Sequence, residues 1–461
     1  MIRPWFATVV CVIGFGLIIQ ANIAQAGLED ILYEKGQITK EEWLKAKADQ
    51  EKAAEPTDAL GEWKKKVEKL AILSDKVNIG INALQMQYLN NDAPVAGVGN
   101  SDNRFFIRRA EFIVWGKVNE YVPKWQILPD FAANSNIGRS SGLNSNSVSG
   151  TGTDNNQILR EAFVEVVPML SLQPYLDKVV IGQYRIPVGI EGSTSSGLID
   201  FINRNYLTQT PATSGNTTGT AAAGTLTSSI DFVQERDLYV NFKSKPIEQL
   251  ELDLGIMNGN GINGVSSAID NNSQKDFFGR ARVKPRKDMF LSFSTIQGTS
   301  TNNNSRNGGR GRGNYDRYIA DFQFTPDFLP GLWIQGEWAW GHDAAPAQVT
   351  DLYAAGARGE VRSGWYVYGK YLFQDGPLKN LELLARYEQF DPSHNVSNDM
   401  LTRSTVGINY YFANMPPKIQ SKLQLNYEFR HHQGNGPNTA VTAFDEFANN
   451  ALLLQFQIRW M

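Results

Sequence analysis

The sequence predicts an all-β fold: a transmembrane antiparallel β-barrel of about 16 strands, with about 18 as the alternative, preceded by a short helical periplasmic segment. Three observations predict it. The C-terminal residues form an alternating strand, similar alternation recurs throughout residues 77–461, and the N-terminus has the form of an export signal. We therefore divide the chain into a signal peptide (1–26), an N-terminal helical segment (27–76) and a barrel domain (77–461).

The C-terminal strand is the most informative element. Side chains alternate between the two faces of an extended strand. One face is wholly apolar, with Leu452, Leu454, Phe456, Ile458 and Trp460; the other is mostly polar, with Leu453, Gln455, Gln457 and Arg459. A strand of about ten residues with these faces spans an outer membrane, and a terminal aromatic ring suits the headgroup level. A soluble β-sandwich could also contain such a strand, so the choice between barrel and sandwich depends on the pattern in the rest of the chain.

The same alternation recurs about every 24 residues after Val77, which favours one closed barrel over a two-sheet sandwich. Clear examples are 238–242, 250–256, 332–340 and 423–429. Connections also fall into two lengths. Short ones carry turn residues (Lys245-Pro246, residues 284–287 and residues 326–331), whereas long ones are rich in Asn, Ser, Thr and Gly (residues 134–156, 209–229, 259–274 and 298–314). This alternation of short and long connections is typical of outer-membrane barrels.

The N-terminus predicts export, and together with the barrel pattern it predicts the cell outer membrane of a Gram-negative bacterium as the location. Arg3 precedes an apolar run over residues 9–19, and Ala24-Gln25-Ala26 forms a small-residue cleavage site. The run is too short to anchor the chain as a membrane helix. Cys11, the single cysteine, lies within this signal, so the mature chain would lack disulfides and thiolate chemistry.

The following segment has helical spacing and cap signals. Gly36 suits a helix C-cap, and Thr39 with Glu42 forms a capping box for a second helix. So small a helical unit cannot bury its own core and requires a partner. A solvated charged spacer is the alternative, because the segment is rich in Lys and Glu.

Overall charge predicts no strong electrostatic partner. Lysine and arginine number 44 against 47 acidic residues, a net charge of −3. Any anion selectivity must therefore come from a local arrangement. We expect no nucleic acid partner, no cofactor and no metal site.

Basic residues concentrate at three places that could select a solute. These are Arg108 and Arg109, then Arg185, then the same-face row Arg280, Arg282 and Lys284. Arg109 has lumen parity with Glu111, whereas Arg108 has lipid parity, so we expect it at the rim or beside a bulge. Guanidinium groups bind oxyanions through paired N–H donors. The alternative is that these cations pair with Glu161, Glu165, Asp321, Glu382 and Glu388 across the lumen.

From about residue 77 to the C-terminus, the chain resembles the phosphate-selective porins of the O and P type. The resemblance is carried by Arg108-Arg109-Ala110-Glu111 with Gly116, and by residues 125–132, 161–165 and 182–189. It implies a sixteen-stranded trimeric barrel in outer-membrane lipid, whose arginine ladder leads small inorganic anions to a narrow site. Arg108 and Arg109 match the paired arginines of the family, and Arg185 matches a basic strand position. No position here matches the lysines of the family's central site.

The predicted function is passive diffusion of small anions, phosphate or other oxyanions, through an outer-membrane channel that is not an enzyme. A general or non-phosphate-specific porin is the first alternative. An outer-membrane hydrolase would need a base from His342, His394, His431 or His432, and the chain has no Gly-x-Ser-x-Gly motif. A barrel adhesin with long binding loops is the third reading.

Overall fold

The computed structural model describes most of the barrel in detail. The described residues are 39, 40, 42, 77–91, 103–134, 158–168, 172, 175–208, 233, 235–259, 275–304, 309–342, 361–391, 394, 400–415, 419–433 and 450–461. The chain divides into two compact units, Met1–Ser74 and Asp75–Met461, which are described separately.

The second unit is built almost entirely from strands. They are β1 (Val77–Asn91), β2 (Asn103–Gly116), β3 (Lys124–Pro129), β4 (Leu159–Val166), β5 (Lys178–Arg185), β6 (Arg236–Ile247), β7 (Leu250–Met257) and β8 (Asp276–Arg286). The second half contains β9 (Met289–Asn304), β10 (Gly309–Phe324), β11 (Leu332–His342), β12 (Val361–Leu372), β13 (Leu381–Asp391), β14 (Leu401–Met415), β15 (Ile419–His432) and β16 (Ala451–Trp460). Two 3-10 helices, η2 (Phe131–Asn134) and η5 (Ser196–Leu198), lie in connections.

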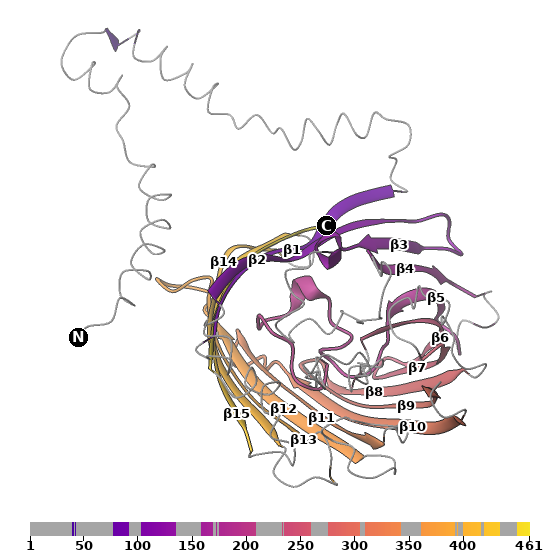
Figure 1. Ribbon diagram of the computed structural model, residues 1–461. Helices are drawn as coiled ribbons and strands as arrows, with labels where there is room; N and C mark the ends of the chain where they lie inside the picture. Colours follow the sequence, from indigo (N-terminus) through magenta and orange to yellow (C-terminus); the bar gives the residue numbers. More distant parts are fainter. Residues whose placement is uncertain are drawn as a thin grey trace. The chain divides into compact units, whose positions relative to one another are not determined.

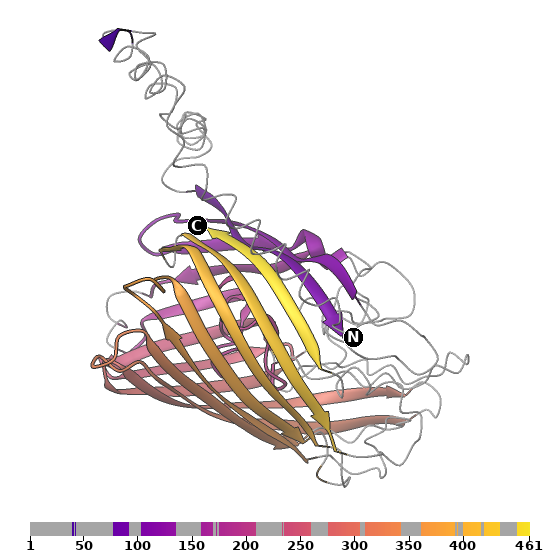
Figure 2. The same ribbon diagram turned by 90° about the vertical axis from the view of Figure 1, so that its left-hand side faces the viewer.

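These strands form one closed antiparallel barrel. Each strand pairs with its neighbours in sequence, and β1 closes the ring by pairing with β16 (Figure 1). Figure 2 shows that the strands are strongly tilted. Closure leaves no unpaired edge, so the backbone polar groups of the wall are satisfied within the sheet. The predicted fold class and the lower of the two strand counts are confirmed.

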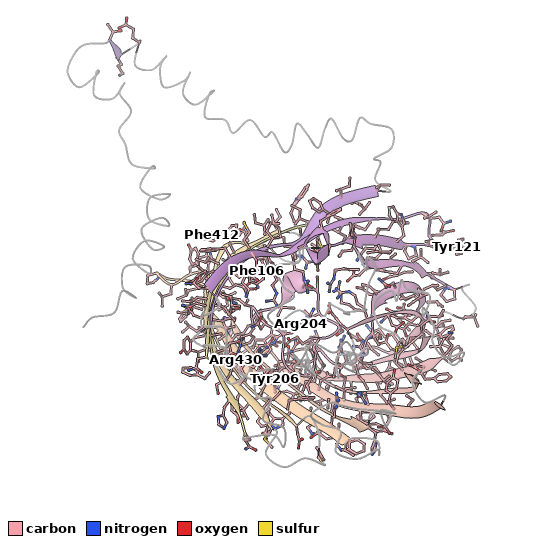
Figure 3. The ribbon with its side chains drawn as sticks, in the orientation of Figure 1. Phe106, Tyr121, Arg204, Tyr206, Phe412 and Arg430 are labelled. Carbon is pink, nitrogen blue, oxygen red and sulfur yellow. The ribbon has the colours of Figure 1, made fainter. Side chains whose placement is uncertain are left out.

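The two faces of the wall follow the sequence alternation. On the outside, Leu254, Phe277 and Phe429 expose 65%, 56% and 50% of their surface. On the inside, Gln424, Asn426 and Glu428 of β15 are fully buried. Figure 3 places Phe412 at the periphery, whereas Arg204 and Tyr206 lie within the ring. An apolar exterior around a polar interior is the distribution that a lipid environment requires.

The turns agree with the sequence in position but not in every boundary. β6 extends through Pro246 to Ile247, and β8 extends through Pro285 to Arg286. Both ladders shift register at these prolines, because proline has no N–H to donate and is tolerated in strands only at edges or bulges.

The prediction of a long loop over residues 298–314 is wrong for most of that range. β9 continues to Asn304 and β10 begins at Gly309, with paired residues between Gly298–Tyr315 and Asn304–Gly309. The ladder formed by the preceding residues of β9 and the following residues of β10 extends into this range, although Asn, Ser and Gly have low strand propensity. The other predicted long loops, over 134–156, 209–229 and 259–274, lie almost wholly outside the described residues.

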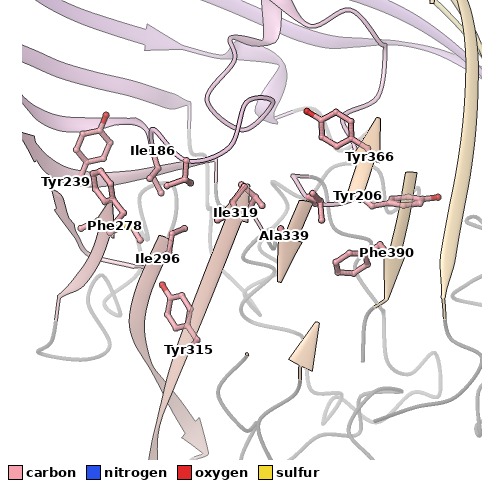
Figure 4. Packing of buried hydrophobic residues seen from close by; sticks show 14 of the residues in the cluster. Ile186, Tyr206, Tyr239, Phe278, Ile296, Tyr315, Ile319, Ala339, Tyr366 and Phe390 are labelled. Carbon is pink, nitrogen blue, oxygen red and sulfur yellow. The ribbon is translucent and has the colours of Figure 1, made fainter. Parts of the chain in front are cut away.

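The interior contains an apolar core as well as polar groups. Tyr239, Phe278, Ile319 and Phe390 from the wall are buried in one cluster with residues of the connection between β5 and β6, among them Ile186 (Figure 4). Residues 186–208 of this connection are therefore packed inside the barrel, where Figure 1 also shows them.

In the first unit the structure describes only the start of the second predicted helix. The Thr39 backbone N–H donates to Glu42 Oε2 at 2.8 Å, and the Glu42 N–H donates to Thr39 Oγ1 at 3.3 Å, so the predicted capping box is present. The hydrogen bonds that Glu42 Oε2 accepts, first from the Thr39 backbone N–H and then from Thr39 Oγ1 at 2.9 Å, lower the pKa of the Glu42 carboxyl. Among the described residues, no helix has the length and apolar character needed to cross a membrane. The predicted signal peptide and the Gly36 cap lie outside the described residues.

Candidate functional site

Residues 186–208 enter the barrel after β5, and we call them the inner loop. Gly189 has a φ of +63°, a left-handed conformation that favours glycine. A Cβ built there would lie 2.6 Å from Glu337 Oε1, so this glycine also allows the loop to approach β11 closely. The Glu337 carboxylate accepts the next backbone N–H, that of Ile190, at 2.7 Å. The inner loop thus bends against the wall as soon as β5 ends.

Asp200 fixes the middle of the inner loop to β12. Its carboxylate accepts from Lys370 Nζ at 2.6 Å and from Tyr368 Oη at 2.9 Å. Lys422 of β15 donates to the adjacent Ile199 carbonyl at 2.6 Å. Burial alone would raise the pKa of the Asp200 carboxyl, but Lys370 and Lys422 together lower it. The group is therefore charged at neutral pH and forms a buried ion pair.

The end of the inner loop is held by strands β13 to β15. Arg386 donates to the Asn203 carbonyl at 3.1 Å, and Arg403 donates to the Arg204 carbonyl at 2.5 Å. The Tyr206 N–H donates to Glu388 at 2.6 Å. These guanidinium groups donate hydrogen bonds to backbone carbonyls and also form ion pairs with carboxylates, so the inner loop is fixed on several strands.

Arg185 and Arg236 meet a single carboxylate on the opposite side of the inner loop. Their Nη2 atoms lie 2.6 Å and 2.9 Å from Glu161 Oε1, and Gln126 donates to Glu161 Oε2 at 2.6 Å. All four side chains are buried. For Arg185, the alternative of pairing with Glu161 therefore describes the observed geometry.

Arg109 lies in a looser network next to this pair. Its guanidinium is 3.6 Å from Glu111 and 3.4 Å from Asp130. Arg160 lies 3.5 Å, 3.7 Å and 3.6 Å from Glu111, Asp130 and Glu235, and its Nε and Nη2 atoms form no hydrogen bond with described residues. These long separations leave hydrogen-bonding capacity on both arginines.

Arg108 differs from the other predicted residues because its partners are neutral. It is the extra residue of a bulge, since Gln85 pairs with Arg109 and Met86 pairs with Ile107. Of the two expected positions, at the rim or beside a bulge, the structure shows the bulge. Arg108 Nη1 donates to Gln87 Oε1 and to Asn203 Oδ1, each at 2.8 Å, and no carboxylate among the described residues lies within ion-pair distance. Its charged neighbours are Arg109, Arg204 and Arg403, with Glu428 as the one acidic neighbour among its main electrostatic contacts.

The predicted basic row lies on β8, facing two carboxylates of β7. Arg280 Nη2 is 2.7 Å from Asp253, which Lys243 of β6 also contacts. Arg282 Nη1 is 3.7 Å from Glu251, which Lys284 also contacts. Each carboxylate is therefore shared by two cations. Of these basic side chains, Lys284 is 38% exposed and Arg282 is 18% exposed.

The structure thus places the six predicted residues in two regions. Arg108, Arg109 and Arg185 belong to the wall near the inner loop, whereas Arg280, Arg282 and Lys284 form the row on β8 towards the short turns. Other charged residues of the first region were missed by sequence reasoning: Arg160, Arg204, Arg236, Arg386, Arg403 and Arg430. For Arg386 and Arg430 the signal was present, since they share the inward parity of Glu388 on β13 and of Glu428 on β15.

The described residues offer little for catalysis or metal binding. No group of three or more His, Cys, Asp or Glu among them could hold a metal ion. His342 Nδ1 is 3.0 Å from Asp316. His394 Nε2 is 2.8 Å from Ser363 Oγ and 3.6 Å from Asp391, so serine and aspartate meet the same ring nitrogen, whereas a catalytic triad places them on opposite nitrogens.

Comparison with known proteins supports the architecture. The family model described as phosphate-selective porin O and P matches residues 77–460. No curated protein matches the chain significantly. Among solved structures, Salmonella typhi OmpF in complex with daunomycin is similar with a TM-score of 0.54 and 11% identity, covering 84% of this chain and 98% of that one.

Two further solved barrels are similar at a lower level. The outer membrane channel DcaP of Acinetobacter baumannii has a TM-score of 0.48 and 11% identity, covering 83% of this chain and 97% of that one. OmpT of Vibrio cholerae has a TM-score of 0.47 and 12% identity, with 84% and 99% covered.

Proposed function

This chain belongs to the phosphate-selective porin O and P family and forms an outer-membrane channel, through which we propose that small anions, phosphate and similar oxyanions among them, diffuse passively. We include in this proposal assembly as a homotrimer and transport without catalysis. Outer-membrane lipids surround the exposed apolar residues of the wall.

One observation carries the anion preference: the sharing of carboxylates on β7. Asp253 serves Lys243 and Arg280, and Glu251 serves Arg282 and Lys284. Asp321 is a further acidic neighbour of Arg282, yet the cations still outnumber these carboxylates. A local positive excess can therefore exist although the whole chain has a net charge of −3.

Arg108 supports the same proposal at the inner loop. Its two hydrogen bonds to neutral amides hold the guanidinium in place without cancelling its charge. Two of its electrostatic neighbours are arginines that lie against inner-loop backbone, namely Arg204 and Arg403. In this proposal an anion passes a positive region at the inner loop and a second one along β8.

A charge-reversal experiment tests the proposal. We expect the wild-type channel to have an anion-selective zero-current potential in a salt gradient, and the double variant Arg280→Glu/Arg282→Glu to move that potential towards cation selectivity. Arg286→Glu is the matched control. Arg286 lies on the same strand, its side chain is 62% exposed, and it pairs with Asp288 rather than with the carboxylates of β7. A cation-selective wild type, or a double variant that behaves like the control, contradicts the proposal.

Phosphate titration separates an oxyanion channel from a general anion porin. Added phosphate should lower chloride conductance through the wild type, because guanidinium groups bind tetrahedral oxyanions through paired donors. Without such a block, the channel would be a general porin rather than one that prefers phosphate.

A further inference from the structure

Two buried carboxylates lie directly opposite each other on the inside of the barrel. Asp321 of β10 and Glu337 of β11 are paired residues in the antiparallel ladder. Side chains at such positions have Cβ atoms about 4.5–5.5 Å apart, and like charges there repel. Asp321 is 4% exposed and Glu337 is 3% exposed, so water cannot screen this repulsion effectively.

Among the described residues, no cation forms an ion pair with either member of this pair. Neither carboxylate has a basic group within ion-pair distance among the described residues. Arg282 and Arg280 of β8 act electrostatically on Asp321, but their ion-pair partners are Glu251 and Asp253. The inner loop adds Glu191, whose own partner is Arg386, and β12 adds the hydroxyl of Tyr366.

Each carboxylate also has one oxygen without a hydrogen bond. Asp321 Oδ1 accepts from Ser292, and Glu337 Oε2 accepts the Ile190 N–H at 2.7 Å and Tyr366 Oη at 3.4 Å. Asp321 Oδ2 and Glu337 Oε1 are buried and have no hydrogen-bond partner among the described residues. A buried acceptor without a donor is costly, and one proton bound between the two groups would serve both oxygens.

We propose that Asp321 and Glu337 share a single proton, and that Glu337 in this pair is a positioning residue that seats the inner loop. The proton reduces the pair to one negative charge, which permits Glu337 to lie between Asp321 and Glu191 while it holds the Ile190 N–H. Loss of the proton places two charges side by side next to Glu191. Repulsion then acts at the point where the inner loop leaves the wall.

A pH series on single channels tests this role. Buried glutamates with pKa values of about 8–9 are known, so the series should run from about pH 5 to about pH 9. The wild type should show a step in closing events or current noise within it. Glu337→Gln keeps a carbonyl oxygen for the Ile190 N–H and lacks the ionisable group, so the step should disappear. Glu165→Gln is the matched control: it removes a lumen carboxyl paired with Lys178, and the step should remain.

Infrared spectroscopy supplies a second readout that does not depend on ion flow. The wild type at neutral pH should show the C=O stretch of a protonated carboxyl, and both Glu337→Gln and Asp321→Asn should remove it. An unchanged band in both variants, or a pH step that survives in Glu337→Gln, overturns the proposal. Sensitivity to a chelator and to added Ca²⁺ would also overturn it, because a bound cation would then compensate the pair. None of these results depends on whether the channel prefers anions.

Discussion

Replacing Glu161 by Gln tests whether the buried ion pairs hold the wall beside the inner loop. Glu161 is fully buried and receives Arg185, Arg236 and Gln126. Gln retains the shape but not the charge, so two buried guanidinium groups lose their shared counter-charge. Removing one partner of a buried pair costs about 3–5 kcal/mol, and we expect a loss of that size in the free energy of unfolding.

The assay is urea unfolding of the refolded barrel in detergent, followed by tryptophan fluorescence. Glu165→Gln is again the control, since Glu165 lies on the same strand and pairs at 2.8 Å with Lys178, which is 30% exposed. A partly exposed pair of this kind contributes about 0–1 kcal/mol. Equal midpoints and slopes for the two variants would refute the reasoning, because burial would then make no difference.

Three further predictions concern local geometry. Gly182→Ala should prevent folding or destabilise the barrel by more than about 2 kcal/mol, because φ is +130° and the new Cβ would lie 2.3 Å from the Ala162 carbonyl oxygen. Gly279→Ala should be neutral, because the atom nearest to its Cβ would be 3.7 Å away, and heat-modifiability on gels shows whether each variant is folded. Asp200→Asn should weaken the attachment of the inner loop and increase single-channel current noise, while the control Lys178→Gln should leave the noise unchanged. The same noise in Asp200→Asn and the wild type would show that Lys370 does not anchor the loop. Because the pKa of Glu42 is lowered, its capping contribution is present above the ordinary value of 4.5 and is lost as pH falls through the lower folded value. A peptide beginning before Thr39 should therefore lose helicity in acid, as measured by circular dichroism, and Glu42→Gln should remove that pH dependence.

Much of the fold was predictable because strand periodicity is a local signal. Leu254 and Phe277 point outward, and Asn426 and Glu428 point inward, as their parity requires. Arg108 violated the parity of its strand, and that violation correctly indicated a bulge. Closure into a barrel of about 16 strands, with 18 as the alternative, followed from repeated spacing rather than from any single motif, and 16 is the number observed.

Contacts between distant residues were not predictable in the same way. The inner loop has neither helical nor strand periodicity, and its contacts join residues far apart in sequence, such as the Ile202 N–H and Asn426 Oδ1 at 2.7 Å. The carboxylates opposite the basic row, Asp253 and Glu251, become partners only through the register of β7 and β8. The proximity of Asp321 and Glu337 likewise depends on the register of β10 and β11.

The zero-current potential of the purified wild-type channel in a potassium chloride gradient tests the central claim most directly. The shared carboxylates on β7 and the neutral partners of Arg108 predict a zero-current potential with the sign that shows preference for chloride over potassium. Arg108→Gln should reduce it, because one unit charge about 4 Å from a passing ion contributes from about 1 kcal/mol in water to about 4 kcal/mol in a confined site. A potential on the potassium side of zero, unchanged in Arg108→Gln, would contradict the account.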